Sequence, residues 1–260
     1  MIAAAPRALA AEGIRVRFGG VVACDDVTIG LDEGEIVGLT GPNGSGKSTF
    51  LNALHGLVPA AGRLEVRGVP VDLGAPRVVR ARGVVRAFQT PQVWGALSTL
   101  ENVLLGSDDR RDIGLAAALL RRPRMLRRER DRWVRAGAAL ARVGLARLAA
   151  TPVSALTYGQ QRLVELARAI AGEPRVLLLD EPAAGLNAAE TRFLADVLAS
   201  LRDEGVAILV VDHKIDFLDS TCQRLVVLQL GRVIAEGPPA EVWQHEDVIA
   251  AYLGIEEAGA

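Results

Sequence analysis

Residues 36–49 read IVGLTGPNGSGKST. The apolar run Ile36–Leu39 predicts a buried strand, followed by a glycine-rich turn and a helix that can end at Gly56. The spacing G-x-x-x-x-G-K-[ST] of a phosphate-binding loop is filled here by Gly41, Gly46, Lys47 and Ser48. Glycines let backbone N–H groups curl inward around a phosphate, and a helix N-terminus favours the same anion. The sequence therefore predicts a site for a nucleoside phosphate.

The lysine and the serine of this loop have distinct expected roles. Lys47 should reach the β- and γ-phosphates, and the Ser48 hydroxyl should ligate Mg²⁺. The chain holds 30 Lys plus Arg, and its only lysines are Lys47 and Lys214, a bias toward arginine that leaves a compact ammonium at this loop. The candidate nucleotide contacts of the loop are Gly41, Asn43, Gly44, Gly46, Lys47, Ser48 and Thr49.

A second apolar run ends in two carboxylates. Val176–Leu179 predicts a central parallel strand that is covered on both faces, and Asp180 and Glu181 follow it directly. Ligands of open α/β sheets bind at the carboxyl ends of the strands. We therefore expect Asp180 to hold Mg²⁺ through water and Glu181 to polarise the attacking water as a general base.

A third predicted strand, within residues 206–216 (VAILVVDHKID), ends near His213. This histidine is expected at the same edge of the sheet, where it can contact the γ-phosphate. The stretch also resembles the [NT]-K-x-D base-reading motif of GTPases, through Lys214 and Asp216. His213 stands where that motif needs Asn or Thr, and Asp180 is followed by Glu-Pro-Ala rather than by x-x-Gly. The sequence therefore favours the γ-phosphate contact over a GTPase motif.

The segments outside these strands indicate a helical subdomain and a set of antiparallel strands. About 130 residues separate the phosphate-binding loop from Asp180, and residues 112–145 are rich in Ala, Leu and Arg, which predicts an inserted helical subdomain broken at Pro123. Its arginine run from Arg121 to Arg135 is either a solvated helix face or a surface for a partner or for membrane headgroups.

Period-two alternation marks the antiparallel strands. It occurs in residues 14–22 and 63–71. Residues 224–237 predict a hairpin turning at Gly231-Arg232, and Pro238-Pro239 then precedes a short helical tail. The predicted domain has its core and β subdomain in residues 8–88 and 172–237 and its helical subdomain in about 92–171, with a tail over 238–260.

Residues 156–160, LTYGQ, permit two interpretations. Thr157 and Gln160 have the spacing of a capping box that starts a helix. The helix would bury a stripe formed by Leu163, Leu166, Ala167 and Ile170. Such a helix N-terminus, with Gly159 open to approach, is also an anion site for a phosphate held elsewhere.

Composition excludes several classes of protein. A formal net charge of −1 and a pI near 6.3 show no general attraction to nucleic acid. No apolar stretch approaches the ~18 residues of a membrane span, and the N-terminus lacks the pattern of a signal peptide. The two cysteines, Cys24 and Cys222, suit a reducing cytosol better than a disulfide framework. We expect a cytosolic protein whose membrane association comes through a partner.

Taken in order, these motifs resemble those of the ATP-binding cassette (ABC) subunits of membrane transporters over nearly the whole chain. The order runs from aromatic Phe18 through the phosphate-binding loop, Gln89 in RAFQTPQ, LTYGQ, LLLDEP and GLN to His213. The segments FGGVVACDDV, ENVLLG, YGQQR, DEPAAGLN and AAYLG most resemble the ATPase subunits of branched-chain amino acid importers. The resemblance implies an α/β fold, a RecA-like P-loop NTPase core with an antiparallel β subdomain and an inserted α-helical subdomain.

The resemblance also implies roles for particular residues. Phe18 would stack on adenine, and Gln89 would join Ser48 and Asp180 as a Mg²⁺ ligand and would sense the membrane subunits. Glu181 would be the catalytic base, with His213 also catalytic. LTYGQ takes the place of the family signature LSGGQ, whose contacts with the ATP of the opposite subunit would fall on Thr157, Gly159 and Gln160.

Four departures from the family pattern stand out. Thr157 keeps the hydroxyl of the signature serine, and Tyr158 replaces a glycine and should point away from the nucleotide. Asn187 stands where many relatives have aspartate, which leaves the role of that loop in communication between sites open. DHKI, at residues 212–215, differs from the usual EHDM of the subfamily.

The implied function is an ATPase that uses ATP and Mg²⁺ to power uptake of branched-chain amino acids or a related small polar solute. Its implied partners are two membrane-spanning permease subunits, a second ATPase subunit and an extracytoplasmic solute-binding protein, with no nucleic acid. The chain would lie in the cytoplasm, peripheral on the inner face of the cell membrane. The alternative is a non-transport ABC ATPase of translation or DNA repair, which the near-neutral charge does not favour.

Overall fold

The computed structural model describes residues 7–87, 90, 92–107 and 122–253, which fall into two compact units. We call residues 1–89 and 175–260 the sheet unit and residues 90–174 the helical unit. Among the helices of the described residues, none combines the length and the apolar character that crossing a membrane requires.

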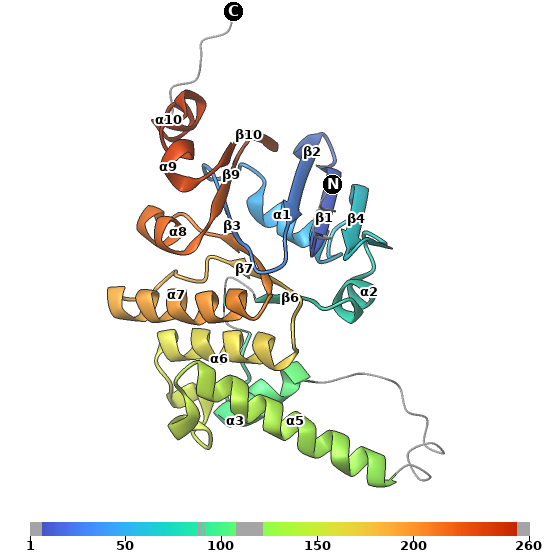
Figure 1. Ribbon diagram of the computed structural model, residues 1–260, viewed down its shortest axis with the longest axis vertical. Helices are drawn as coiled ribbons and strands as arrows, with labels where there is room; N and C mark the ends of the chain where they lie inside the picture. Colours follow the sequence, from blue (N-terminus) through green and yellow to red (C-terminus); the bar gives the residue numbers. More distant parts are fainter. Residues whose placement is uncertain (1–6, 88–89, 91, 108–121, 254–260) are drawn as a thin grey trace, which may run out of the picture. The chain divides into compact units, whose positions relative to one another are not determined.

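The sheet unit is built on a six-stranded sheet of order β10-β9-β3-β8-β7-β6 (Figure 1). Its strands are β3 (Ile36–Thr40), β6 (Val84–Ala87), β7 (Val176–Asp180), β8 (Ala207–Val211), β9 (Arg224–Gln229) and β10 (Arg232–Gly237). All neighbours are parallel except β10, which runs antiparallel to β9. Every residue of β3, β7 and β8 is buried, which confirms the prediction of a central strand covered on both faces.

The unit also contains a four-stranded antiparallel sheet of order β2-β1-β4-β5. It contains β1 (Leu9–Phe18), β2 (Val21–Leu31), β4 (Ala61–Val66) and β5 (Val69–Val71). Ile14 and Val16 are buried whereas Arg15 and Arg17 are exposed, as their period-two alternation predicted.

Helix α1 (Lys47–Leu54) joins the two sheets into one core. Its Phe50, Leu51 and Leu54 belong to a single buried cluster that also contains residues of both sheets. The helix ends as predicted, with Gly56 in the left-handed region at φ 75°. The remaining helices of the sheet unit are α2 (Pro76–Ala81), α7 (Ala188–Asp203), α8 (Ile215–Thr221), α9 (Pro239–Val242) and α10 (Glu246–Leu253).

The β9–β10 hairpin turns one residue earlier than predicted. Arg232 pairs with Gln229, so the two-residue turn is Leu230-Gly231 and not Gly231-Arg232. Both turn residues have positive φ, 47° and 79°. A two-residue turn that follows the right-handed twist of its strands needs positive φ at both positions. Leucine rarely adopts positive φ, so the exposed Leu230 was not expected at a turn position.

Three helices pack together among the described residues of the helical unit: α3 (Thr99–Leu104), α5 (Arg122–Arg142) and α6 (Tyr158–Ala171). The 3₁₀ turn η1 (Leu105–Ser107) follows α3, and η2 (Ala146–Leu148) and η3 (Val153–Ala155) lie between α5 and α6. Pro123 lies in the first turn of α5, where the missing N–H costs nothing. Residues 108–121, which include the start of the arginine run, lie outside the described residues.

Most of the described part of the arginine run is exposed, whereas Arg132 and Arg135 are half-buried. Every residue from 126 to 131 is exposed, and Arg132 forms an ion pair with Glu129 at 3.0 Å. Both predicted roles of the run, a solvated face and a partner surface, require this exposure, so both remain predictions.

Candidate nucleotide-binding site

Three glycines of the phosphate-binding loop adopt positive φ: Gly41 at 138°, Gly44 at 81° and Gly46 at 106°. A Cβ on Gly41 would lie 2.0 Å from the Leu228 carbonyl oxygen, and one on Gly46 would lie 2.3 Å from that of Ala23. A Cβ on Gly44 would meet nothing within 4 Å. Backbone packing therefore requires two of the glycines, whereas conformation alone requires the third.

The N-terminus of α1 carries no side-chain cap. Its N-cap residue is Gly46, and no side chain bonds to the first turn there, whereas α6 and α7 both begin with a capping box. The first N–H groups of any helix lack intrahelical acceptors. These donors, from Lys47 onward, are therefore available to an anion, as the loop pattern predicted.

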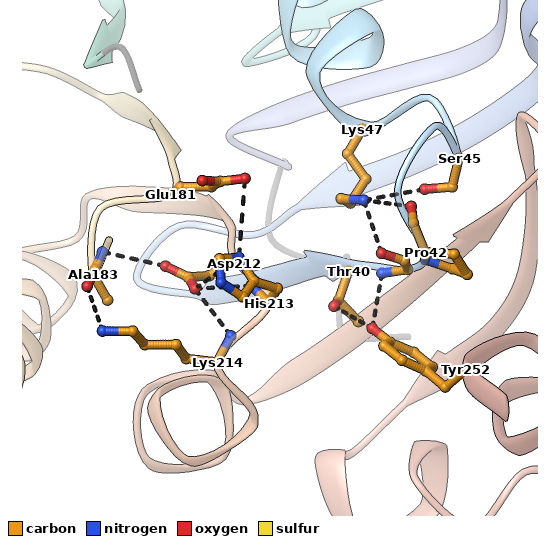
Figure 2. A network of polar contacts seen from close by, with 11 residues as sticks. Thr40, Pro42, Ser45, Lys47, Glu181, Ala183, Asp212, His213, Lys214 and Tyr252 are labelled. Atoms are coloured by element: carbon orange, nitrogen blue, oxygen red, sulfur yellow. Dashed lines mark hydrogen bonds and ion pairs between the residues drawn. The ribbon is translucent and has the colours of Figure 1, made fainter. Parts of the chain in front are cut away.

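Lys47 reaches back over its own loop. Its Nζ donates to the carbonyl oxygens of Gly41 and Pro42, each at 2.8 Å, and to Ser45 Oγ at 3.3 Å (Figure 2). Burial lowers the pKa of this ammonium, and the nearby carboxylates of Glu181 and Asp180 oppose that shift. The fold thus brings Lys47 close enough to Asp180 and Glu181, the two acids predicted for the same site, for their charges to act on its ammonium group.

Asp180 ends β7 with one oxygen paired and one unpaired. Its Oδ2 accepts a hydrogen bond from Arg86 Nη2 at 2.8 Å, and both side chains are almost fully buried. Arg86 Nη1 donates to Asn52 Oδ1 of α1. The other oxygen, Asp180 Oδ1, is buried without a hydrogen-bond partner among the described residues. A buried carboxylate oxygen without a hydrogen-bond partner is suited to bind a hard cation such as Mg²⁺, directly or through a water molecule.

Arg86 was not predicted from the sequence, although its segment RAFQ was singled out for Gln89. Gln89 itself lies outside the described residues. The signal available for Arg86 was a charged residue inside an otherwise apolar strand, β6, since such a residue needs a buried partner.

Glu181 and His213, the two predicted catalytic residues, lie together. His213 Nδ1 is 3.9 Å from Glu181 Oε1, and the histidine side chain is exposed (Figure 2). Glu181 has a positive φ of 47°, and its N–H donates to the Val211 carbonyl oxygen at 2.7 Å. Such a conformation of a non-glycine residue typically costs ~1–3 kcal/mol and is concentrated at functional sites.

An unpredicted contact joins the C-terminal helix to the phosphate-binding loop. The Tyr252 hydroxyl lies 2.7 Å from Thr40 Oγ1 and accepts a hydrogen bond from the Gly41 N–H at 3.1 Å (Figure 2). The Trp243 ring meets Tyr252 edge-on at 6.1 Å, and its Nε1 donates to Asp219. Tyr252 belongs to the segment AAYLG, which carries part of the family resemblance, but no contact of this tyrosine was predicted from the sequence.

Phe18 ends β1, at the hairpin with β2, and is 50% exposed. A half-exposed aromatic ring has a face that a planar base can cover. Its predicted role in stacking on adenine is therefore compatible with its position in the sheet unit.

In the helical unit, LTYGQ starts α6 with a capping box. Thr157 Oγ1 accepts from the Gln160 N–H at 3.3 Å, and Gln160 Oε1 accepts from the Thr157 N–H at 3.0 Å, which confirms the predicted cap. The predicted stripe is buried, as the low exposures of Leu163, Leu166, Ala167 and Ile170 show.

One expectation about LTYGQ is wrong. Gly159 is buried, not open to approach, because neighbouring groups cover a residue that has no side chain to extend beyond them. Thr157 and Tyr158 are the exposed residues of the segment. The Tyr158 ring lies under the Arg162 guanidinium at 5.7 Å.

Asn187 has a structural task that was not predicted from the sequence. Its Oδ1 accepts from the N–H groups of Ala189 and Glu190 at 2.9 and 3.0 Å, and its own N–H donates to Glu190 Oε2. It is the N-cap of α7 in a full capping box. Asparagine and aspartate serve this position about equally well.

Two family models match the chain. The model described as ABC transporter matches residues 24–184, and that described as branched-chain amino acid ATP-binding cassette transporter matches residues 232–258. The high-affinity branched-chain amino acid transport ATP-binding protein LivG of Salmonella typhimurium is 39% identical over 249 residues, covering 95% of this chain and 97% of that protein. BraF of Pseudomonas aeruginosa, which bears the same description, is 36% identical and covers the same shares.

Solved structures have the same fold. A nucleotide-free ATP-binding cassette from an ABC transporter matches with a TM-score of 0.83 at 29% identity, covering 95% of this chain and 98% of that one. A structure of an ADP conformation of such a cassette matches with a TM-score of 0.82 at 29% identity, covering 95% and 99%. The similarity therefore extends far beyond the phosphate-binding loop, over nearly the whole chain.

Proposed function

The chain belongs to the ABC transporter family, and from this membership we propose that it is the ATP-hydrolysing subunit of an importer for branched-chain amino acids or a related small polar solute. One observation carries the solute class. Relatives with that description align over nearly their whole length, and the separate C-terminal match at residues 232–258 has the same description. Because those relatives are transport proteins, the non-transport alternative in translation or DNA repair is not favoured.

In the sheet unit, ATP binds with Mg²⁺. The N–H groups at the start of α1 and the Lys47 ammonium hold the phosphates, and Phe18 stacks on the adenine. Ser48, Asp180 and Gln89 would hold the ion, whose charge would neutralise that of the β- and γ-phosphates. The unpartnered, buried Asp180 Oδ1 supports this assignment.

Hydrolysis uses the two residues that meet at the edge of the sheet. Glu181 takes the proton of the attacking water, and His213 contacts the γ-phosphate. The 3.9 Å distance between His213 Nδ1 and Glu181 Oε1 supports joint action on one water and one phosphate.

The second half of each site comes from another cassette. Thr157 and Gln160 face the γ-phosphate of ATP held by the opposite subunit, and ATP binding closes the pair. The partners are two permease subunits and a solute-binding protein outside the membrane, so that the chain lies on the cytoplasmic face of the membrane. The exposure of Thr157 supports this arrangement, because its hydroxyl can receive a partner's phosphate at the capped N-terminus of α6.

A mixed pair of variants tests the composite site. Lys47→Ala removes a phosphate contact within the chain. Thr157→Asp keeps a good helix cap but places a carboxylate where the partner's phosphate should arrive. Each variant alone forms pairs with both sites damaged, whereas a mixed pair collects both defects in one site and leaves the other intact. We expect ATP-dependent dimerisation, measured with Glu181→Gln in every chain, to recover only in the mixture.

Thr157→Ser is the matched control, since it keeps both the cap and the hydroxyl, and it should dimerise like the parent chain. The composite site is refuted if the mixture closes on ATP no better than either variant alone.

The transport role needs a separate measurement. The full chain, purified from detergent-solubilised membranes of its own cells, should retain hydrophobic membrane subunits rather than ribosomes or DNA. After reconstitution with its solute-binding protein, ATP hydrolysis should rise with leucine, isoleucine or valine. Stimulation by ribose but by none of these amino acids would show that the proposed solute class is wrong.

A further inference from the structure

The segment after β8 holds both polar backbone groups of Ala183, in the loop after β7. Asp212 Oδ2 accepts a hydrogen bond from the Ala183 N–H at 3.2 Å, and Lys214 Nζ donates to the Ala183 carbonyl oxygen at 2.6 Å (Figure 2). Ala183 lies two residues after Glu181, and His213 lies between Asp212 and Lys214. Hydrogen bonds to the N–H and to the carbonyl oxygen of Ala183 thus connect the two loops that carry the predicted catalytic residues.

Lys214 spans the loop as well as contacting Ala183. Its ammonium also lies 3.4 Å from the Leu186 carbonyl oxygen, next to the Asn187 cap that starts α7. Three donors on a compact head suit converging carbonyl groups better than a planar guanidinium does. In a chain that otherwise uses arginine, the other lysine, Lys47, binds loop carbonyl oxygens in the same manner.

Asp212 binds the N–H side of Ala183. Its carboxylate is fully buried, and its Oδ1 accepts from the N–H groups of His213 and Lys214 at 2.8 and 3.0 Å. One carboxylate therefore fixes the backbone at His213 and, through Oδ2, the backbone at Ala183. Hydrogen bonds to an ionised group are among the stronger ones in proteins, so this link resists separation of the two loops.

We propose that Lys214 and Asp212 form a clamp on Ala183 that positions Glu181 against His213 for ATP hydrolysis. The inference rests on the proposed roles of Glu181 and His213. Glu181 needs such support, because its left-handed backbone persists only where its surroundings impose it. A misplacement of catalytic groups by 1 Å can cost ~10²-fold in rate. The clamp gives a role to Lys214, the basic residue that follows the histidine in DHKI.

The clamp makes a prediction that separates the two Michaelis parameters. Lys214→Met keeps the length of the side chain but removes its donors and charge, and should lower kcat by about tenfold or more. KM and the Kd for ATP should stay within about twofold, because the phosphate-binding loop makes no contact with Lys214 in the described structure. Asp216→Asn is the matched control: its carboxylate is exposed on the same segment, and its kcat should be unchanged.

Rescue distinguishes positioning from a general loss of structure. Lys214→Cys treated with 2-bromoethylamine regains an ammonium at nearly the original distance, and its kcat should return toward that of the parent. The native thiols are poor competitors, because burial raises the pKa of Cys24 to about 11 and that of Cys222 to about 12. The parent chain treated in the same way controls for them.

A double-variant cycle tests whether the two side chains act as one clamp. Asp212→Asn places an amide group where a carboxylate oxygen accepted a backbone N–H, and should also lower kcat. If both residues act through Ala183, Lys214→Met should lower kcat little further in that background. Fully multiplicative effects would show that they act separately, and the clamp would be wrong.

Glu181→Gln, measured in parallel, keeps the two proposals distinguishable. Full hydrolysis by that variant refutes the proposed catalytic base. An inactive Glu181→Gln beside a Lys214→Met variant with parental kcat refutes the clamp alone. If the methionine variant does not fold, Lys214→Leu, which likewise has no donor, carries the same test: a parental kcat and KM again overturns the inference.

Discussion

The loop after β3 and the loop after β7 lie at the same edge of one sheet, but contacts of very different range hold them. In the phosphate-binding loop, Lys47 bonds to residues two to six positions before it. In the loop after β7, the partners of Ala183 are Asp212 and Lys214, 29 and 31 positions away. Both lysines bind carbonyl oxygens, yet only the first does so within its own motif. The lysine contacts of the phosphate-binding loop are therefore local, whereas the loop that carries the predicted catalytic Glu181 depends on contacts made by the packed sheet.

The largest expected effect separates the two loops by function. Glu181→Gln should leave ATP binding intact and lower steady-state hydrolysis by about 10²-fold or more, because the base is lost while the phosphate contacts remain. Lys47→Ala is the matching change in the other loop and should weaken binding itself. Equilibrium binding and turnover on both variants check this, and a Glu181→Gln chain that no longer binds ATP would break the distinction.

The next effect tests how closely the phosphate-binding loop depends on its glycines. Gly46→Ala forces positive φ on alanine and brings its Cβ to within 2.3 Å of the Ala23 carbonyl oxygen, so the free energy of unfolding should fall by about 2–3 kcal/mol. Gly44→Ala suffers only the conformational cost, because its Cβ meets nothing within 4 Å, and should lose about 1 kcal/mol. Equal losses in denaturant unfolding would contradict the role given to backbone packing.

A smaller effect is expected for the adenine contact. Phe18→Ala should weaken ATP affinity by about 1–2 kcal/mol through lost stacking. The melting temperature should barely change, because the ring is half exposed. Val21→Ala alters its exposed cross-strand neighbour and should leave affinity unchanged. Titration with a fluorescent ATP analogue measures both, and equal affinity in Phe18→Ala and the parent would place the base elsewhere.

The smallest effect concerns the long-range contact of the phosphate-binding loop. Tyr252→Phe keeps the ring against Trp243 but removes the hydroxyl that binds Thr40 and Gly41, and should cost about 1 kcal/mol in the free energy of unfolding. Thr40→Val removes the opposite partner, and the double variant should be less destabilised than the sum of the two changes. A loss of ATP binding in Tyr252→Phe would show that this loop, too, depends on distant support.

Much of the site could be predicted from local spacing. The phosphate-binding loop, the buried strand before Asp180 and the capping box at Thr157 and Gln160 all form within a few residues, where chain geometry decides which groups meet. The cap at Asn187 had the same local signal, Asn followed three residues later by Glu190, and sequence reasoning missed it.

The helices and strands, their order along the chain and the residues able to bind a phosphate thus follow from local sequence, because they depend on backbone preferences and short-range hydrogen bonds. The tertiary structure alone decided that Arg86 pairs with Asp180, that Tyr252 reaches Gly41 and that Lys214 holds Ala183. It also decided that Gly159 is buried. Each of these contacts depends on which strands become neighbours and how closely they pack. The order of strands in the sheet is determined by burial of apolar surface across the whole sheet rather than by any single motif.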